Sequence, residues 1–195
     1  MKDVALVVVD MLYDFIDGSM ACKNAGEAVD ETVRFIDRFT ETAEHSEEVI
    51  YGTFPILFVR DSHPGDHCSF TPQGGPWPPH CVEGTRGADI HERLAPYATP
   101  ALTFRKGFRQ DTEQYSGFEG VNDAGQTLGE VLSLLDIKNV YVCGIATEYC
   151  VRNTCEDLRK AGFQVYLLSN CLGYVDYAGH LEALDAMTRS GIRMK

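Results

Sequence analysis

Residues 139–169 read NVYVCGIATEYCVRNTCEDLRKAGFQVYLLS, and this stretch decides the fold class. Residues 139–145 are mainly apolar and predict a buried strand. Residues 148–161 predict a helix, and residues 163–169 form a second apolar run that predicts another strand. A strand, a helix and a further strand in this order indicate an α/β fold with a mainly parallel sheet.

The same alternation extends from this stretch toward both ends of the chain. Further strands are predicted at residues 2–10, 56–60, 101–104 and, as a short edge strand, 192–194. Further helices are predicted at residues 27–45, 127–135 and 178–189. No repeat, low-complexity segment or domain boundary interrupts this pattern. We therefore expect residues 1–195 to form a single α/β domain.

The composition bounds the possible partners and the location. With 195 residues, 44% of them apolar, the chain can bury one core. A net charge of −12 argues against binding to a nucleic-acid backbone. The first apolar run, residues 4–9, is too short for a secretion signal, and no run approaches the roughly 20 residues of a membrane span. Seven cysteines, an odd number, then predict free thiols and a cytoplasmic location.

Chemically capable groups follow three of the predicted strands. Asp10 follows the first strand, Asp61 and His63 follow the second, and the turn that ends at Cys150 follows a later one. The carboxyl ends of parallel strands meet at one edge of the sheet, where active sites of α/β proteins gather. An aspartate at a strand end is more often a turn or helix-cap residue, so Asp10 alone decides nothing. The coincidence of three such positions is the functional signal.

Residues 61–88 form a long irregular segment rich in Gly, Pro and His, and such a loop inside a compact domain is usually functional. It offers one carboxylate and two imidazoles as candidate metal ligands: Asp61, His63 and His80. This set suits Zn²⁺, Fe²⁺ or Mn²⁺ and leaves coordination positions open, although His67 lies between its members and spacing alone does not fix the choice. A solvated polar loop is the alternative. Trp77 is suited to stack on a flat substrate or, alternatively, to pack the loop against the hydrophobic core.

Cys150 stands at the start of the helix predicted at residues 148–161. The amides at a helix start lower the pKa of a thiol and stabilise a developing oxyanion, which makes Cys150 the candidate nucleophile. Cys155 lies deeper in the same helix and is a weaker candidate. Lys106 follows the third strand and would favour a nearby thiolate, although two neighbouring arginines compete for that role.

Taken together, these residues resemble the isochorismatase-like hydrolase family and, within it, the nicotinamidase (pyrazinamidase) branch. The resemblance covers nearly the whole chain. It rests on VDM at 9–11 with DF at 14–15, DSHP at 61–64, GGPWPPHC at 74–81, RKG at 105–107, YSGF at 115–118 and GIATEYCV at 144–151. The last string and the metal loop are highly specific, whereas the opening strand alone is a weak signal.

The resemblance implies a three-layer α/β/α sandwich around a six-stranded, mainly parallel sheet. It also implies a role for each of several residues in this chain. The catalytic triad would be Asp10, Lys106 and Cys150. The metal ligands would be Asp61, His63 and His80, with Ser69 near a further, water-mediated contact. The backbone amides of Ala146 and Cys150 would form an oxyanion hole next to a cis peptide between Ile145 and Ala146. The substrate would lie against Phe15, Trp77, Ala146 and Tyr149.

Two positions depart from the family pattern. Ser62 replaces the tryptophan that relatives usually carry between the metal-loop aspartate and histidine, which implies a thinner wall near the site. Ser69 stands in the region where some relatives place a glutamate ligand.

The activity that the resemblance implies is metal-dependent hydrolysis of nicotinamide to nicotinate and ammonia, in the salvage of NAD breakdown products. Zinc is the first choice of metal, with iron and manganese as alternatives. A second hypothesis is an amidase for another small carboxamide or ureido compound, which the metal loop disfavours. A third is a metal or thiol sensor without catalysis. We expect a small-molecule substrate as the partner, with no nucleic acid or membrane, and leave homo-oligomerisation open.

Overall fold

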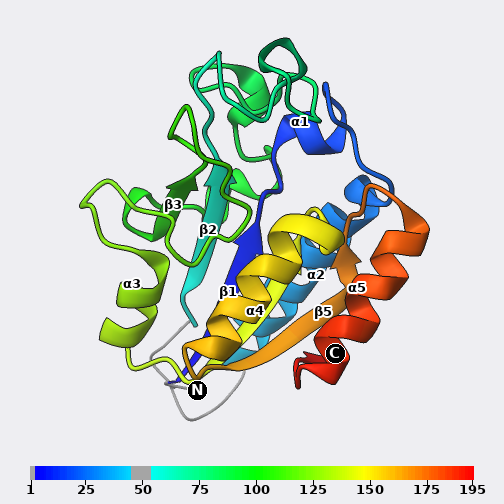
Figure 1. Cartoon of the computed structure of the whole chain (residues 1–195). Coiled ribbons are helices and arrows are strands. Elements are labelled where there is room, and N and C mark those ends of the chain that lie inside the picture. The colour runs from blue at the N-terminus through cyan, green and yellow to red at the C-terminus, as the bar shows by residue number, and fades with distance from the viewer. Residues whose placement is uncertain (1–2, 45–53) are drawn as a thin grey trace.

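The structure is a computed structural model that describes residues 3–44 and 54–195. Six strands form one sheet in the order β3-β2-β1-β4-β5-β6, and each neighbouring pair is parallel (Figure 1). Their bounds are β1 Val4–Val9, β2 Ile56–Asp61, β3 Thr103–Lys106, β4 Asn139–Gly144, β5 Gln164–Leu172 and β6 Arg193–Met194. The predicted six-stranded, mainly parallel sheet is therefore confirmed.

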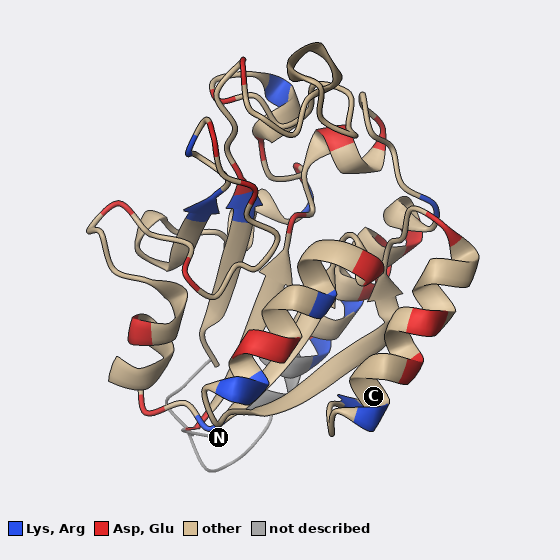
Figure 2. Ribbon diagram, viewed as in Figure 1, with Lys and Arg blue, Asp and Glu red and all other residues tan. Residues whose placement is uncertain are grey.

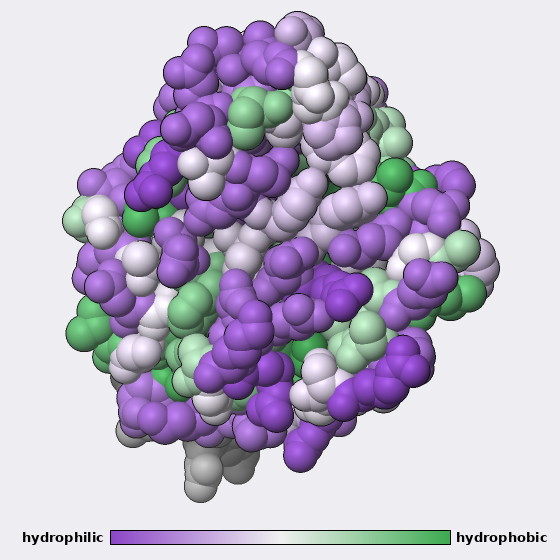
Figure 3. Space-filling view, viewed as in Figure 1, coloured by the Kyte–Doolittle hydropathy of each residue, from purple (hydrophilic) through white to green (hydrophobic). Residues whose placement is uncertain are grey.

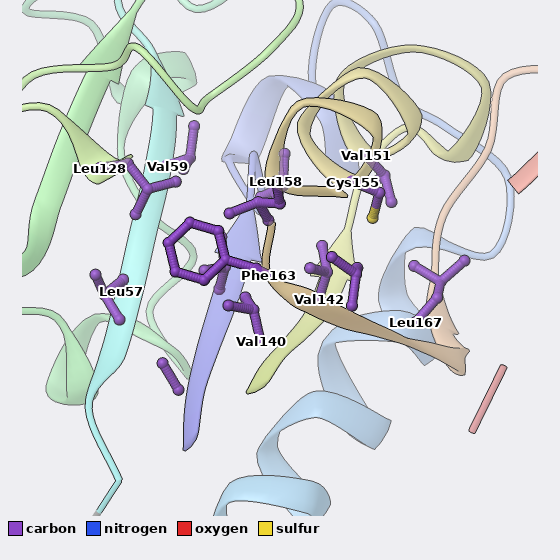
Figure 4. Close-up of a cluster of buried hydrophobic side chains, with 14 of the residues drawn as sticks. Leu57, Val59, Leu128, Val140, Val142, Val151, Cys155, Leu158, Phe163 and Leu167 are labelled. Atoms are coloured by element: carbon purple, nitrogen blue, oxygen red, sulfur yellow. The ribbon is translucent and has the colours of Figure 1, made fainter. Parts of the chain in front are cut away.

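Helices cover both faces of this sheet. Over one face lie α3 Leu128–Leu134, α4 Arg152–Lys160 and α5 Tyr177–Arg189, and over the other lies the long helix α2 Ala25–Glu44 (Figure 1). A hydrophobic core fills each interface, and Figure 4 shows the one beneath α3 and α4. The predicted three-layer α/β/α sandwich is confirmed.

The β1 strand shows why its sequence is almost continuously apolar. Successive side chains of a strand point to opposite faces of the sheet. Val7 and Val9 accordingly belong to the core beneath α3 and α4, while Leu6 and Val8 belong to the core beneath α2. All four side chains are fully buried. A strand with two buried faces has no position for a polar residue until it ends.

Several predicted bounds differ from the observed ones. The helix predicted at residues 27–45 begins at Ala25, and residue 45 lies outside the described residues. The helix predicted at 148–161 begins with a π-helical turn, Thr147–Val151, before α4. The strand predicted at 101–104 starts later because the 3₁₀ turn Pro100–Leu102 precedes it. The four-residue helix α1, Tyr13–Ile16, is too short to show a helical period and was not predicted.

The order of the strands locates the place where a site can form. From β1 the chain moves outward through β2 and β3, and it then returns to pair β4 with the other side of β1. The connections at the carboxyl ends of β1 and β4 therefore leave in opposite directions and open a crevice between them. Asp10 directly follows β1, and the turn that carries Cys150 follows β4. Both residues lie at this crevice.

The outer surface over α4 and α5 is mainly hydrophilic (Figure 3). Within residues 3–44 and 54–195, no helix combines the length and the apolar content needed to cross a bilayer. All seven cysteines fall in the described part of the chain, and all are free thiols, as predicted.

Candidate active site

Asp10, Lys106 and Cys150 meet at the carboxyl edge of the sheet. The ammonium nitrogen Nζ of Lys106 lies 2.9 Å from Oδ2 of Asp10 and donates to Sγ of Cys150 at 3.3 Å. A carboxylate oxygen of Asp10 lies within 4.8 Å of the same sulfur atom. All three residues are buried. The thiol thus faces the aspartate, as the resemblance implies.

The backbone at Asp10 aims its carboxylate into the crevice. Asp10 has a φ of +49°, in the left-handed region that a residue other than glycine seldom adopts. Its N–H donates to the carbonyl of Val59, and its Oδ1 accepts from the N–H of Asp61 at 2.9 Å. Oδ2 makes no well-aligned hydrogen bond, although Lys106 lies beside it. Oδ2 is therefore free to accept a proton from a neighbouring donor.

Burial and charge set the protonation of these groups. Burial, reinforced by Asp61, raises the pKa of Asp10 to about 6 against the opposing effect of Lys106. Burial raises the pKa of the Cys150 thiol well above its ordinary value, and Lys106 opposes this while Asp10 and Asp61 add to it. Burial would lower the pKa of Lys106, but the two carboxylates raise it well above its ordinary value. The sequence predicted a lowered thiol pKa; because burial outweighs the lysine, the resting thiol keeps its proton.

The turn that carries Cys150 leaves one backbone donor unused. The carbonyl of Ala146 accepts hydrogen bonds from the N–H groups of Tyr149 and Val151, at 3.1 and 3.2 Å. The N–H of Ala146 has no acceptor among the described residues. The peptide bond between Ile145 and Ala146 is cis, as the resemblance implies. Ala146 and Cys150 line the same pocket, so a free donor is available close to the thiol.

Asp61, His63 and His80 lie at the second end of this site. One potential ligand atom from each lies within 4.8 Å of the others, and all three residues are buried. His63 donates from Nδ1 to the carbonyl of Gly107 at 2.7 Å, and His80 donates from Nδ1 to the carbonyl of Pro78 at 2.8 Å. Because a carbonyl only accepts, each ring carries a proton on Nδ1, which leaves Nε2 as the ring nitrogen that can bind a metal ion. A carboxylate with two imidazoles held in this way fits a divalent metal ion.

Asp61 joins the two ends of the site. Its Oδ1 lies 2.5 Å from Nζ of Lys106, and its Oδ2 lies 3.5 Å from Nε2 of His63. Burial would raise the pKa of Asp61, but Lys106 and His63 outweigh burial and hold it below the usual value, so the carboxylate stays ionised. Gly107 has a φ of +66°, and a Cβ there would lie 2.4 Å from Cε1 of His63. Only glycine allows the backbone to approach this ring so closely.

His67, which the spacing in the sequence did not exclude as a metal ligand, uses both ring nitrogens in other hydrogen bonds. Its Nε2 donates to the carbonyl of Thr112 at 3.2 Å, and its Nδ1 accepts from the hydroxyl of Ser69 at 2.7 Å. Both ring nitrogens therefore have partners other than the three candidate ligands, although the ring centroid of His67 lies 4.3 Å from that of His63. Ser69 is buried against His67, and its predicted water-mediated metal contact stays a prediction. Ser62 is also buried, its hydroxyl has no partner among the described residues, and it does not line the pocket described below.

A pocket lined by aromatic side chains reaches both Cys150 and Asp61. All four side chains predicted to contact a substrate line it: Phe15, Trp77, Ala146 and Tyr149. Further lining residues were not predicted: Met20, Cys22, Glu113, Tyr115 and Val175. Tyr115 accepts a hydrogen bond from Nε1 of Trp77 at 3.2 Å, and its ring centroid lies 5.5 Å from that of Tyr149. The YSGF string contains Tyr115, but no pattern in the sequence pointed to its role as a wall.

Comparison with known proteins gives similarity over nearly the whole chain. The family model of the Isochorismatase domain matches residues 4–194. The chain is 35% identical over 193 residues to the nicotinamidase/pyrazinamidase of Mycobacterium tuberculosis, covering 97% of each protein. It is similar to the crystal structure of the pyrazinamidase of Pyrococcus horikoshii in complex with zinc, with 36% identity, a TM-score of 0.81 and coverage of 99% of this chain and 98% of that one. It is also similar to the structure of PnC1 from L. infantum in complex with nicotinate, with 32% identity, a TM-score of 0.81 and coverage of 100% and 92%.

Proposed function

Since the chain belongs to the isochorismatase family, we propose that it is an enzyme that hydrolyses nicotinamide to nicotinate and ammonia. The observation that carries this proposal is the placement of a thiol next to an aspartate and a lysine, with Asp61 of a divalent-metal ligand set paired to the same lysine and lining the same pocket as the thiol. The similarity to a nicotinamidase over 97% of both proteins, and to a structure that holds nicotinate, supports this choice of substrate.

We assign the nucleophile to Cys150 and the base to Asp10. Oδ2 of Asp10 accepts the thiol proton as the sulfur attacks the amide carbon of the substrate. The ammonium group of Lys106, 3.3 Å from the sulfur, stabilises the negative charge that develops there. A base is needed because burial keeps the resting thiol protonated.

The tetrahedral intermediate carries its negative charge on the former carbonyl oxygen. We assign the oxyanion hole to the backbone N–H groups of Ala146 and Cys150, and the unused donor on Ala146 supports this assignment. One such donor is commonly worth about 3 to 4 kcal/mol in the transition state. The C–N bond then breaks, and Asp10 returns its proton to the departing ammonia. Water, losing a proton to Asp10, hydrolyses the acyl-cysteine to nicotinate and restores the thiol.

We propose that Asp61, His63 and His80 hold a divalent metal, with Ser69 in water-mediated contact. Zinc is our first choice over iron or manganese, because the Pyrococcus relative was solved with zinc and the donor set suits it. When bound, the ion supplies a Lewis acid toward the ring nitrogen of the substrate.

We propose that Phe15, Trp77 and Tyr149 pack against the substrate ring. The cavity beside Cys150 has a volume of about 30 Å³. An engineered cavity that binds benzene measures about 150 Å³, so entry of a ring requires side chains to move. Trp77 and Tyr115 are only partly buried, are joined by one hydrogen bond and pack on Tyr149, and we propose that these aromatic walls move to admit the ring.

Ammonia release from nicotinamide, measured with and without a metal chelator, tests the proposal. We expect turnover that chelation removes and that added metal restores. Turnover of a different carboxamide or ureido compound that is insensitive to the chelator would replace nicotinamide hydrolysis with the general amidase. Absence of turnover on every amide tested would favour a sensor without catalysis.

We further propose that residues 1–195 form one domain whose metal-binding loop spans residues 61–88. The match of the family model to residues 4–194 and the single six-stranded sheet support this. The predicted cytoplasmic location is kept as a proposal, and seven free thiols are consistent with a reducing compartment.

A further inference from the structure

Two arginines lie side by side behind the active-site strands. Arg60 on β2 and Arg105 on β3 are direct partners in the parallel ladder, and Figure 2 shows basic residues at the carboxyl ends of both strands. Each arginine comes one residue before an active-site group, Asp61 or Lys106, which are also ladder partners. Because successive strand residues point to opposite faces, the two guanidinium groups lie on the face of the sheet away from the thiol.

The two arginines are poorly compensated. The Nε atom of each is buried and has no hydrogen-bond partner in the part of the chain that the structure describes. Arg105 pairs with Glu83 at 3.2 Å, and both of those side chains are substantially exposed. Arg60 makes no ion pair with any residue in the described ranges 3–44 and 54–195. Neighbouring strands lie only about 4.8 Å apart, so the two arginines start from adjacent backbone positions, and Glu83 forms an ion pair with one of them.

A pocket opens directly onto this pair. It has a volume of about 280 Å³, and Thr99, Thr103 and Asp123 line it together with the two arginines. Asp123 is exposed, so it places its charge in contact with solvent. Pockets for drug-sized ligands measure roughly 300 to 1,000 Å³, so this one suits a smaller molecule. In a protein of net charge −12, a cavity that holds two guanidinium groups, one of them without an ion pair among the described residues, is an exception to the general charge.

We propose that this pocket binds a small phosphate-bearing anion between Arg60 and Arg105. A guanidinium group presents parallel N–H donors that match two phosphate oxygens, and two adjacent guanidinium groups match the charge of a phosphate dianion. Such an anion would offer acceptor oxygens to the two arginines, whose Nε atoms lack a partner among the described residues, and would add negative charge beside Arg60, which has no ion pair there. The site is independent of the chemistry at Cys150, from which the sheet separates it.

Isothermal titration of the metal-loaded protein tests the site. The probes are inorganic phosphate, pyrophosphate and methyl phosphate, each at constant ionic strength set with sodium chloride. We expect saturable binding of one anion per chain, weakened at least tenfold in Arg60→Gln and in Arg105→Gln. The exposed arginine of β6 provides a matched control, and Arg193→Gln should bind as the wild type does. Glu83→Gln, which removes the carboxylate that pairs with Arg105, should tighten binding.

The identity of the preferred probe separates the possible sources of the phosphate group. Inorganic phosphate as the best ligand identifies a free anion, and methyl phosphate as the best ligand identifies a phosphate ester; both support the site. Equal affinity of wild type and Arg60→Gln would overturn it, because phosphate bound at the metal ligands would survive that substitution. Equal heats with sodium chloride alone would also overturn it, since they would indicate only ionic screening.

Discussion

The two ends of the active-site pocket are built in different ways. The thiol end rests on regular structure, because Asp10 follows β1, Lys106 ends β3 and Cys150 lies in the first helical turn after β4. The metal end takes His63 and His80 from a long irregular loop. Continuous backbone hydrogen bonds fix the strands and therefore the thiol end. The metal end depends instead on single side-chain and backbone anchors.

Asp14 is the clearest of these anchors. Its Oδ2 accepts from the N–H of Cys81 at 2.7 Å, next to His80, and its Oδ1 accepts from the N–H of Ser19 at 3.1 Å. A Cβ on Gly87 would lie 2.0 Å from the same carboxylate, so the loop closes tightly around it. The strand ends therefore position the nucleophile by themselves, whereas metal ligands in a loop need polar contacts of their own.

The largest effect is expected at the thiol end. Cys150→Ala should lower turnover by roughly 10⁴-fold or more, because it removes the nucleophile. Its metal content should equal that of the wild type, since the ligands lie at the other end. Ammonia release and metal per chain measure the two quantities. Cys155→Ala, a buried cysteine on α4, is the control and should remain active. Near-normal turnover in Cys150→Ala would remove this thiol from the mechanism.

Substitution of a candidate metal ligand should affect the metal end and leave the thiol end unchanged. His80→Ala should weaken metal binding by at least about 100-fold, more than loss of a hydrogen-bond partner behind a ligand typically does. Competition with a chromogenic chelator measures this affinity. The rate of Cys150 alkylation, followed by mass spectrometry, should stay within a few-fold of the wild type because β1, β3 and the turn after β4 are unchanged. His91→Ala, outside both ends, is the control. Full metal retention in His80→Ala would exclude it as a ligand.

The same contrast explains how much the sequence could predict. Hydrophobic periodicity identified the elements that carry the thiol end, and the helix predicted at 127–135 matches α3 within one residue at each end. The irregular loop has no period. The residue types in it suggested a metal, but only the structure shows that the ring nitrogens of His67 hydrogen-bond to Ser69 and Thr112.

Sequence patterns did not predict which segments far apart in the chain contact one another. The short distance from Lys106 to Asp61 follows from the register of β3 against β2, which no local pattern encodes. Tyr115 and Val175 form pocket walls from loops that show no periodicity, and both were missed. The raised pKa of the Cys150 thiol arises from complete burial, which the position at a helix start did not reveal.

A smaller effect should follow from weakening the anchor of the metal loop. Asp14→Asn replaces one acceptor oxygen with an amide that faces a backbone N–H, so the segment next to His80 should loosen. We expect roughly a tenfold loss of metal affinity, as for residues that orient a ligand. Excess metal should restore turnover, because the thiol end is untouched. Asp66→Asn, an exposed aspartate of the same loop, should change neither. Turnover that stays low at saturating metal would mean that Asp14 acts on more than the metal end.

The smallest effect is expected from a substitution that lies outside both the thiol end and the metal end of the site. Thr127 caps α3 by accepting from the N–H of Glu130, whose carboxylate accepts from the N–H of Thr127 in return. Thr127→Ala should lower the free energy of unfolding by about 1 kcal/mol, measured by urea denaturation. Ser133→Ala, within the same helix, removes only a side-chain bond to a helix carbonyl and should be nearly neutral. Metal affinity and turnover should stay at wild-type values in both variants. A loss of turnover in Thr127→Ala would mean that the thiol end depends on the stability of a remote helix, and not only on the strand ends that position it.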